Sequence, residues 1–322
     1  MIIRTHAFCT DSRSSWQWAS RQERIRRTLL LLPTAQLPTA NCQLMNVFDC
    51  HIHVQPWQMV KPEVLAMIDD ASHANARDVL ASPENLLRYL DDEGVERACC
   101  INYVSPDVMG FTREVNDWIA DFTKDHRDRL IPVGSVNPLH EMHVRDEIRR
   151  VLDLGIGLIK IHPPHQLLSP NAYRGELWQL AEIYRECEAR GVPVMFHTGT
   201  SVFPRARNVF ADPMPIDDVA IDFPKLTIIL AHAGRPLHGE TAFFLTRRHP
   251  NVHVDISGIP PKSLLRFVPR LADIADKVLW GTDWPSPGVV SMKKNVAEFR
   301  ALGLGEAIER KILWDNATRI FA

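Results

Sequence analysis

Residues 47–54 read "VFDCHIHV", a largely apolar run that carries Asp49, His51 and His53. Valine, isoleucine and phenylalanine at this density are typical of a buried β-strand. Because side chains alternate along a strand, we expect the three polar side chains to share one face and the residues between them to share the other. Two imidazoles and a carboxylate on one face of a buried strand raise the question of a functional site, which this strand alone does not decide because alternating histidines also occur by chance.

The composition is that of a globular protein. The chain has 322 residues, of which 45% are hydrophobic and 24% charged, which suits one large α/β domain or two smaller ones. A net charge of −2 argues against nucleic acid or an anionic membrane as the main partner. The six cysteines have neither ligand-like nor disulfide spacing. We therefore expect a cytoplasmic protein that acts on a small molecule and does not bind a membrane.

The first 44 residues differ from the rest. An apolar stretch at 29–32 is stopped by Pro33, so it does not make a signal peptide. The tandem repeat "LPTAQLPTA" has no amphipathic period. We interpret residues 1–44 as a disordered or non-native extension, with Met45 as the natural start, and residues 45–322 as one domain.

From Met45 onward, short runs rich in β-branched residues alternate with amphipathic segments. We predict strands at 46–53, 97–104, 131–136, 156–162, 192–197, 226–232, 252–257 and 277–283. We predict helices at 84–93, 112–127, 141–154, 173–190, 239–249 and 262–275, with Gly94, Gly155 and Gly191 at C-terminal stop positions. Eight such alternations in about 280 residues predict a (β/α)₈ TIM barrel, whose usual size is about 250 residues. A doubly wound sheet is the competing fold.

Polar residues recur where the predicted strands end. They are His51 and His53 in the first strand, Lys160 and His162 in the fourth, His197 in the fifth, His232 in the sixth and Asp283 in the eighth. In a closed barrel these carboxyl ends meet at one mouth, where such enzymes place their sites. Imidazoles and a carboxylate suit Zn²⁺ or a similar divalent ion. Asp49 is expected to orient a neighbour, and Asp255 and Ser257 belong either to the mouth or to the supporting structure.

The motifs "DCHIHV", "KIHP", "FHTG", "AHAG" and "GTDWP", with "NATRIF" near the C-terminus, resemble the amidohydrolase superfamily. More closely, they resemble its amidohydrolase-related branch of decarboxylase-like enzymes, lactonases and metal-dependent hydrolases. The resemblance covers roughly residues 45–322 and is specific for the superfamily but not for a substrate. It implies a TIM barrel and a divalent metal held by His51, His53, His197 and Asp283, with His232 in an activating role.

The chemistry of these side chains suggests their roles. The three histidine ligands would hold an ion that activates a water molecule. Asp283 would bind the ion and accept the proton of that water, and His232 would hydrogen-bond the water or a substrate oxygen. "KIHP" resembles the segment in which some superfamily members carry a carbamylated lysine between two metals, so Lys160 is a further candidate ligand. We expect one metal per chain, with two as the alternative.

The loops after the strands carry candidate substrate-binding residues. Arg235 directly follows "AHAG", and a guanidinium there suits a carboxylate. Further candidates are Arg205 and Arg207 in the loop "TSVFPRARNVFADP", together with Trp57, His165 and Trp284.

The expected activity is metal-dependent hydrolysis of an ester, lactone or amide bond in a small carboxylate-bearing substrate. Non-oxidative decarboxylation at the same site is the alternative, and a non-catalytic metal-binding protein is a third reading. Only the resemblance suggests a homodimer.

Overall fold

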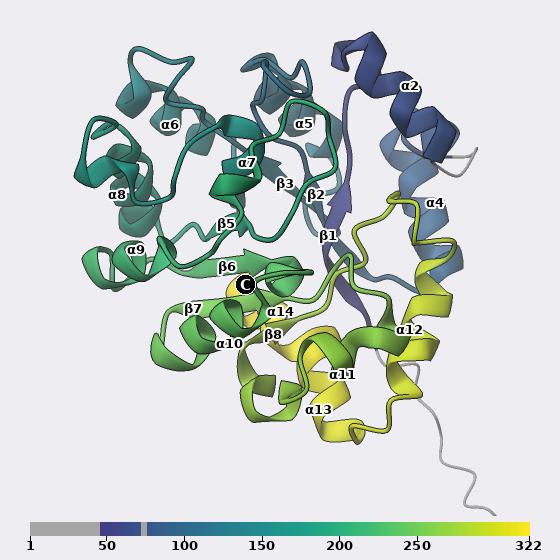
Figure 1. Ribbon diagram of the computed structural model, residues 1–322. Coiled ribbons are helices and arrows are strands. Elements are labelled where there is room, and N and C mark those ends of the chain that lie inside the picture. Colours follow the sequence, from purple (N-terminus) through teal and green to yellow (C-terminus); the bar gives the residue numbers. More distant parts are fainter. Residues whose placement is uncertain (1–45, 72–75) are drawn as a thin grey trace, which may run out of the picture. The chain divides into compact units, whose positions relative to one another are not determined.

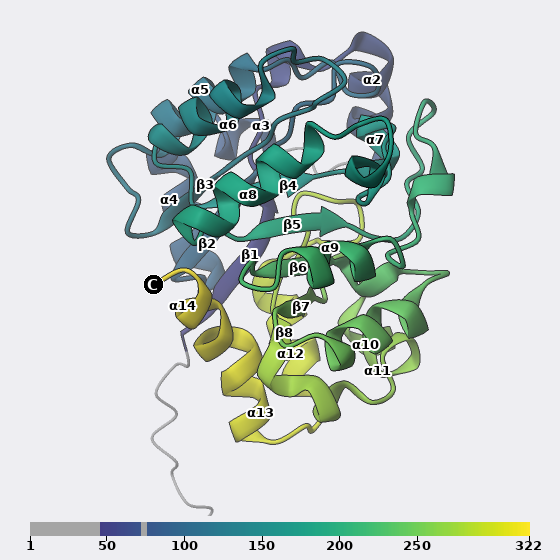
Figure 2. The ribbon, with the colours of Figure 1, turned by 90° about the vertical axis from the view of Figure 1, so that its left-hand side faces the viewer.

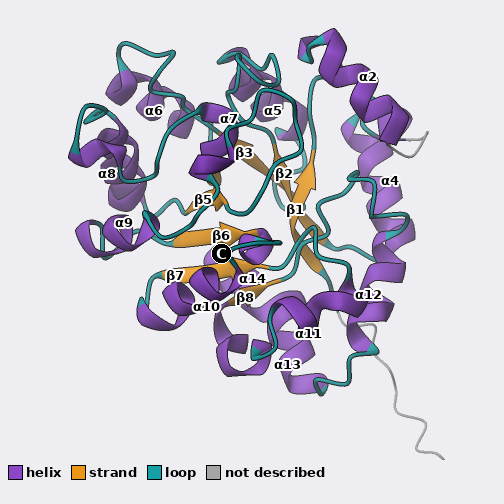
Figure 3. Ribbon diagram, in the orientation of Figure 1, coloured by secondary structure: helices purple, strands orange, loops and turns teal. Residues whose placement is uncertain are grey.

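The computed structural model describes residues 46–71 and 76–322. In these residues eight parallel strands form one sheet in chain order, surrounded by helices, which is a TIM barrel (Figures 1 and 3). The strands are β1 (Phe48–His53), β2 (Arg97–Ile101), β3 (Leu130–Gly134), β4 (Leu158–Ile161), β5 (Val194–His197), β6 (Ile228–Ala231), β7 (Val252–Asp255) and β8 (Val278–Leu279). Each lies within one predicted strand except β3, which begins one residue before the predicted 131–136, so the predicted fold is confirmed.

The main helices between the strands match most of the predicted segments. They are α2 (Pro62–Ala71), α3 (Ala76–Val79), α4 (Pro83–Glu93), α5 (Glu114–Thr123), α6 (Val144–Asp153), α7 (Pro163–Gln166), α8 (Leu180–Arg190), α9 (Ile216–Asp222), α10 (Gly239–Arg248), α11 (Leu264–Phe267), α12 (Met292–Arg300), α13 (Glu306–Arg310) and α14 (Asn316–Ile320). The predicted helix 173–190 begins only at Leu180, and 262–275 contains the short helix α11 between two 3₁₀ segments. The helices that were not predicted are α2, α3, α7, α9, α12, α13 and α14. In the described part of the chain no helix is both long and apolar enough to cross a membrane.

Strand β1 closes the barrel against the chain that follows β8. The Cys50 amide donates to Trp280 O at 2.9 Å, the Asp283 amide donates to His51 O at 2.8 Å, and the His53 amide donates to Trp284 O at 2.7 Å. Helix α14 packs beside β1 and β8 (Figure 2). The first and last strands of the domain are therefore neighbours, and their polar residues face one another at the mouth.

The core has two layers. Inside the barrel, one layer contains Phe48, Cys50, Cys99, Ile101, Val133, Leu158, Met195, Ile229 and Leu279. Between the barrel and the helices, the other contains Ile52, Val54, Cys100, Ile159, Phe196, Leu230, Val254 and Trp280. This alternation along each strand leaves one face for the interior and one for the helices.

Strand β1 departs from the simple alternation that its sequence predicts. Phe48 and Cys50 pack inside the barrel, whereas Ile52 and Val54 pack outside it. The register against β2 shifts between Asp49 and Ile52, as at a β-bulge, so the alternation changes phase there. The prediction that Asp49 shares a face with both histidines was wrong. The Asp49 carboxylate instead accepts hydrogen bonds from the Thr282 amide and hydroxyl.

The stop glycines are confirmed. Gly94 and Gly191 cap α4 and α8 in the left-handed region, with φ of 74° and 67°. The interpretation of residues 1–44 as an extension falls outside the described residues.

Candidate metal and substrate site

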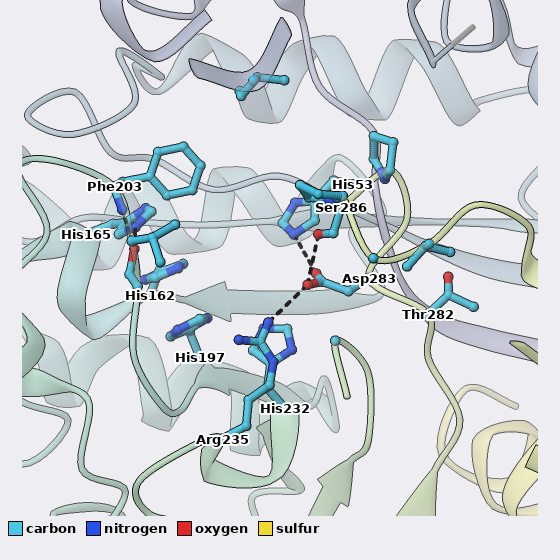
Figure 4. Close-up of a pocket in the computed structure, with 18 of the residues that line it drawn as sticks. His53, His162, His165, His197, Phe203, His232, Arg235, Thr282, Asp283 and Ser286 are labelled. Carbon is cyan, nitrogen blue, oxygen red and sulfur yellow. Dashed lines mark hydrogen bonds and ion pairs between the residues drawn. The ribbon is translucent and has the colours of Figure 1, made fainter. Parts of the chain in front are cut away.

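A cavity of about 360 Å³ opens at the carboxyl ends of the strands (Figure 4). Its size suits a small ligand. Its walls are largely apolar, and the predicted site residues among those that line it are His53, Trp57, His162, His165, His197, His232, Arg235 and Asp283. The strand ends therefore do converge on one pocket.

Three side chains at the base of this pocket are grouped closely enough to hold one metal ion. His51, His232 and Asp283 each offer a ligand atom within 4.8 Å of the others. His53 adjoins the group, with its Nε2 3.1 Å from Asp283 Oδ1. Figure 4 shows the carboxylate of Asp283 between His53 and Arg235. Three imidazoles and one carboxylate form a donor set suited to Zn²⁺ or a related divalent ion.

Asp255 and Ser257 orient two of these imidazoles. His51 Nδ1 donates to Asp255 Oδ2 at 2.6 Å, and the Ser257 hydroxyl donates to the same oxygen at 2.8 Å. Nδ1 of His232 lies 3.0 Å from Ser257 Oγ, to which it donates. Because Nδ1 carries the hydrogen in both rings, each Nε2 presents a lone pair. Asp255 and Ser257 thus support the site, one of the two roles that the sequence left open.

The protonation states also fit a metal site. Burial lowers the pKa of His51 and His232 well below the ordinary value, so both rings are neutral. Burial alone would raise the pKa of Asp283, but the His53 hydrogen bond and nearby positive charge hold it below its usual value. Nε2 of His51 is buried without a hydrogen-bond partner among the described residues. A buried lone pair beside an ionised carboxylate is the arrangement that a divalent cation completes.

The backbone turns sharply at two of these residues. His232 and Asp283 adopt positive φ angles of 65° and 68°, immediately after β6 and shortly after β8. Such conformations are costly for residues other than glycine and concentrate at functional sites. Here they accompany side chains that point into the mouth of the barrel.

His197 lies beside the metal group but outside it. Its Nε2 is 3.2 Å from Gly199 O, and its ring centroid is 4.8 Å from that of His232. Its ring stacks on His162, whose ring stacks in turn on His165, at centroid distances of 3.8 and 3.7 Å. The predicted ligand His197 therefore belongs, in this conformation, to a stack of three imidazoles along the cavity wall.

Lys160 is enclosed beneath the metal group. Its side chain is 1% exposed, and its Nζ has no hydrogen-bond partner among the described residues. Burial lowers its pKa to about 8, while Asp255 and Asp283 oppose this shift. A readily deprotonated amine is what the carbamylation hypothesis requires.

Arg235 lies where the sequence predicts it, at the pocket. Its Nη2 is 3.3 Å from Asp283 Oδ2. Two glycines make room for it. A Cβ on Gly258 would lie 2.4 Å from that Nη2, and one on Gly199 would lie 1.9 Å from Arg235 O. The glycine of "FHTG" therefore allows the chain after β5 to pass the chain after β6.

Three predicted substrate-binding residues do not line the cavity. Arg205 and Arg207 are exposed, because their loop carries them away from the pocket. Trp284 is buried against Tyr89, with ring centroids 4.9 Å apart, because the chain turns back into the outer layer after Asp283.

Sequence reasoning missed Tyr103 and Ser286. Ser286 Oγ donates to Asp283 Oδ2 at 3.0 Å, and the hydroxyl of Tyr103 lies 2.9 Å from His165 Nδ1. A signal for Tyr103 was present, because it continues the inward alternation of Cys99 and Ile101 beyond the end of β2.

The chain resembles several proteins of known structure. An uncharacterised TIM-barrel protein from Bordetella bronchiseptica is 23% identical, with a TM-score of 0.67 over 85% of this chain and 98% of that one. A 5-carboxyvanillate decarboxylase variant from Novosphingobium aromaticivorans, crystallised with bound manganese, is 19% identical, with a TM-score of 0.58 over 86% and 97%. At these identities the likeness shows the fold.

Sequence comparison gives a shorter match and a longer one. A 4-sulfomuconolactone hydrolase from Rhizobium radiobacter is 36% identical over 72 residues, which span 20% of this chain and 24% of that relative. The model of the amidohydrolase family matches residues 48–322, nearly the whole of the described chain. The chain therefore belongs to the amidohydrolase family.

Proposed function

We propose that this protein is a metal-dependent hydrolase that cleaves an ester or lactone bond in a small carboxylate-bearing substrate. An amide bond is a further possible target, which would be slower to hydrolyse. The observation that carries the proposal is the position of Asp283. One oxygen of this ionised carboxylate faces His51 and His53, and the other faces Arg235 and Ser286. A single carboxylate thus joins the metal group to the anion-binding end of the pocket.

His51, His53, His232 and Asp283 are the residues that would hold the metal, with His197 as a further candidate. A divalent ion bound there would supply Lewis-acid activation of water and of a carbonyl oxygen. Asp283 Oδ1 would accept a proton from the attacking water and return it to the leaving oxygen. Arg235 would bind the substrate carboxylate, and the apolar cavity wall would exclude bulk water.

Decarboxylation is the second candidate, because the short distance between Arg235 and Asp283 favours it. Arg235 lies 3.3 Å from Asp283, so a carboxylate bound by this guanidinium would lie next to the metal group and not at the far end of the substrate. A carboxylate at the reacting centre is what loss of carbon dioxide requires. The decarboxylase among the similar structures is consistent with this candidate.

The test combines metal analysis with a substrate panel. Protein stripped of metal and reloaded with Zn²⁺ or Mn²⁺ would be assayed for acid release from carboxylate-bearing lactones and aryl esters, and for carbon dioxide release from hydroxybenzoates. We expect metal-dependent acid release, lost with a chelator and kept in the surface variant His143→Gln. Carbon dioxide release alone would replace the first candidate by the second. A metal-loaded protein inactive on both sets would contradict both.

The number of metals is tested in the same experiment. We propose one metal per chain, with Lys160 uncarbamylated. Two equivalents per chain in the wild type, falling to one in Lys160→Ala, would establish the two-metal alternative.

A further inference from the structure

Three residues far apart in sequence form a hydrogen-bonded row along the cavity wall. The Tyr103 hydroxyl lies 2.9 Å from His165 Nδ1, and His165 Nε2 lies 2.7 Å from Ser201 Oγ. Tyr103 follows β2, His165 lies in α7 after β4, and Ser201 follows β5. All three line the same cavity, although none belongs to the metal group.

His165 is held firmly at the centre of this row. Its ring stacks on His162 at 3.7 Å and meets Phe203 edge-on at 5.2 Å. The side-chain labels of Figure 4 show His165, His162 and Phe203 together at one end of the pocket. The ring is 1% exposed, and burial lowers its pKa to about 3. A neutral imidazole has one N–H and one lone pair, so it donates at one end of the row and accepts at the other.

The contacts of Ser201 favour one direction for the row. Its Oγ accepts a hydrogen bond from the Phe203 amide at 3.3 Å, and among the described residues His165 Nε2 is the acceptor within reach of its hydroxyl hydrogen. His165 then carries its hydrogen on Nδ1 and donates it to the oxygen of Tyr103. In this arrangement the hydroxyl hydrogen of Tyr103 is not used within the row and can be donated into the cavity.

Tyr103 is suited to donate and not to accept a proton. Its side chain is 3% exposed, and burial, reinforced by Asp283, raises its pKa above the ordinary value. The hydroxyl therefore stays protonated. Its ring lies 6.4 Å from that of His53, so a ligand bound beside the metal group would reach it.

We propose that the Tyr103 hydroxyl is a hydrogen-bond donor to an oxyanion of the substrate, and that His165 and Ser201 are positioning residues that fix its hydrogen toward the cavity. The ligand class is a planar carboxylate that carries a second oxygen able to bear negative charge, such as an enolate, a phenolate or a polarised carbonyl. Arg235 would hold the carboxylate and Tyr103 the second oxygen. The proposal names the substrate contacts of the proposed function and rests on it for the assignment of the pocket.

The experiment measures how a coloured probe ionises when bound. The probe is 4-hydroxy-3-nitrobenzoate, a planar carboxylate whose phenol changes absorbance when it loses its proton. Metal-loaded wild-type protein would be titrated with this probe across pH 5–8. A donor at Tyr103 stabilises the phenolate form, so we expect the apparent phenol pKa of the bound probe to lie below its value in free solution.

Three variants identify the source of this shift. Tyr103→Phe keeps the ring and should bind the phenolate about 10- to 100-fold more weakly, up to the lower end of the loss that follows removal of one preorganised donor. Ser201→Ala keeps the Tyr103 hydroxyl but no longer fixes the hydrogen-bond direction through His165. It should therefore weaken phenolate binding by less than Tyr103→Phe does. Tyr184→Phe is the matched control, because its buried hydroxyl donates to Pro170 O in the outer layer.

The results separate this proposal from the proposed function. A probe shift that disappears in Tyr103→Phe and persists in Tyr184→Phe supports the donor role, even if the panel finds no hydrolysis. Equal phenolate affinity and equal spectra in wild type and Tyr103→Phe would overturn it, as would no binding of the probe at millimolar concentration. A loss in Ser201→Ala that affects the protonated probe as strongly as the phenolate would remove the positioning role from the row.

Discussion

The proposed function gives Asp283 two roles, as a metal ligand and as a proton acceptor; its Oδ1 faces the imidazoles of His51 and His53, and its Oδ2 faces the guanidinium of Arg235. Asparagine keeps the shape but cannot accept a proton at neutral pH. We expect Asp283→Asn to keep the fold and much of the metal while losing about 10²–10⁴-fold in turnover, the range for a positioned general base. Metal analysis and steady-state kinetics on the substrate found by the panel would measure both properties.

His51→Ala is the comparison for this variant. Removing a histidine from the metal group should reduce metal content and activity together. An Asp283→Asn protein with normal turnover would contradict the base role and shift it to His232.

Asp255 acts on the metal site through the imidazoles that it holds. Its Oδ2 accepts hydrogen bonds from His51 and Ser257, and Ser257 in turn accepts one from His232. Asparagine there would weaken the anchoring of both rings. We expect Asp255→Asn to lower metal affinity by roughly 10- to 100-fold, as for other partners of ligating histidines. Competition with a metal-binding dye would measure it, and an unchanged affinity would rule out the orienting role.

At the scale of elements, the contact between β1 and the chain after β8 closes the barrel. The Thr282 hydroxyl donates to Asp49 Oδ2 at 2.6 Å, and the Thr282 and His51 amides both donate to Oδ1 at 3.0 Å. The carboxylate has no solvent exposure. These three donors therefore replace the water that would otherwise solvate the carboxylate.

Thr282→Val removes one of the three donors at nearly constant volume. We expect it to lower the free energy of unfolding by about 1–3 kcal/mol, the cost of leaving a buried acceptor short of a partner. Urea unfolding followed by tryptophan fluorescence would show the shift. Thr282→Ser keeps the hydroxyl that donates to Asp49 and serves as the control; a Thr282→Val protein as stable as Thr282→Ser would contradict the role of this hydroxyl.

At the scale of the whole domain, stability should depend on pH through His253 in β7. Burial, with Lys277 and Arg319 nearby, lowers its pKa to about 4, whereas the unfolded value is about 6.5. As the pH falls between these values, the unfolded chain takes up a proton that the folded protein resists. The contribution of His253 to the free energy of unfolding is therefore lost as the pH falls from about 6.5 to about 4, and this group causes no further loss below that pH.

His253→Gln removes this titrating group. Apparent urea midpoints of the wild type and the variant, compared at pH 7.5 and pH 5, should show a larger decrease for the wild type. Parallel decreases would mean that His253 takes up its proton equally in both states.

The sequence was sufficient for the fold because the strands are short, mostly apolar runs, nearly all of which end in a polar residue or are followed directly by one. It was also sufficient for the convergence of His51, His232 and Asp283, since parallel strands bring their ends together wherever they lie in the chain. It could not reveal the direction of individual side chains. The bulge in β1 changes the face of Asp49, and the path of the loop after β5 turns Arg205 and Arg207 outward.

The alternation of residues along each strand also gave no sign of the hydrogen bonds that surround the candidate ligands. The serine of "VDISG" contacts His232 only because β6 and β7 are paired, and Tyr103 meets His165 only because α7 folds back over the pocket. Both contacts are tertiary. The homodimer suggested by the resemblance stays a prediction, which light scattering at micromolar concentration would test.

Barrel closure has a consequence for the order in which the protein is made. His51 leaves the ribosome more than 200 residues before Asp283, and β1 acquires its second neighbour only when the last strand arrives. Until then the metal group lacks the carboxylate of Asp283. A nascent or truncated chain therefore carries the early histidines without a competent centre. Metal retention can accordingly serve as a reporter of completed synthesis and folding, since the set of possible ligands is completed in the same step that closes the barrel.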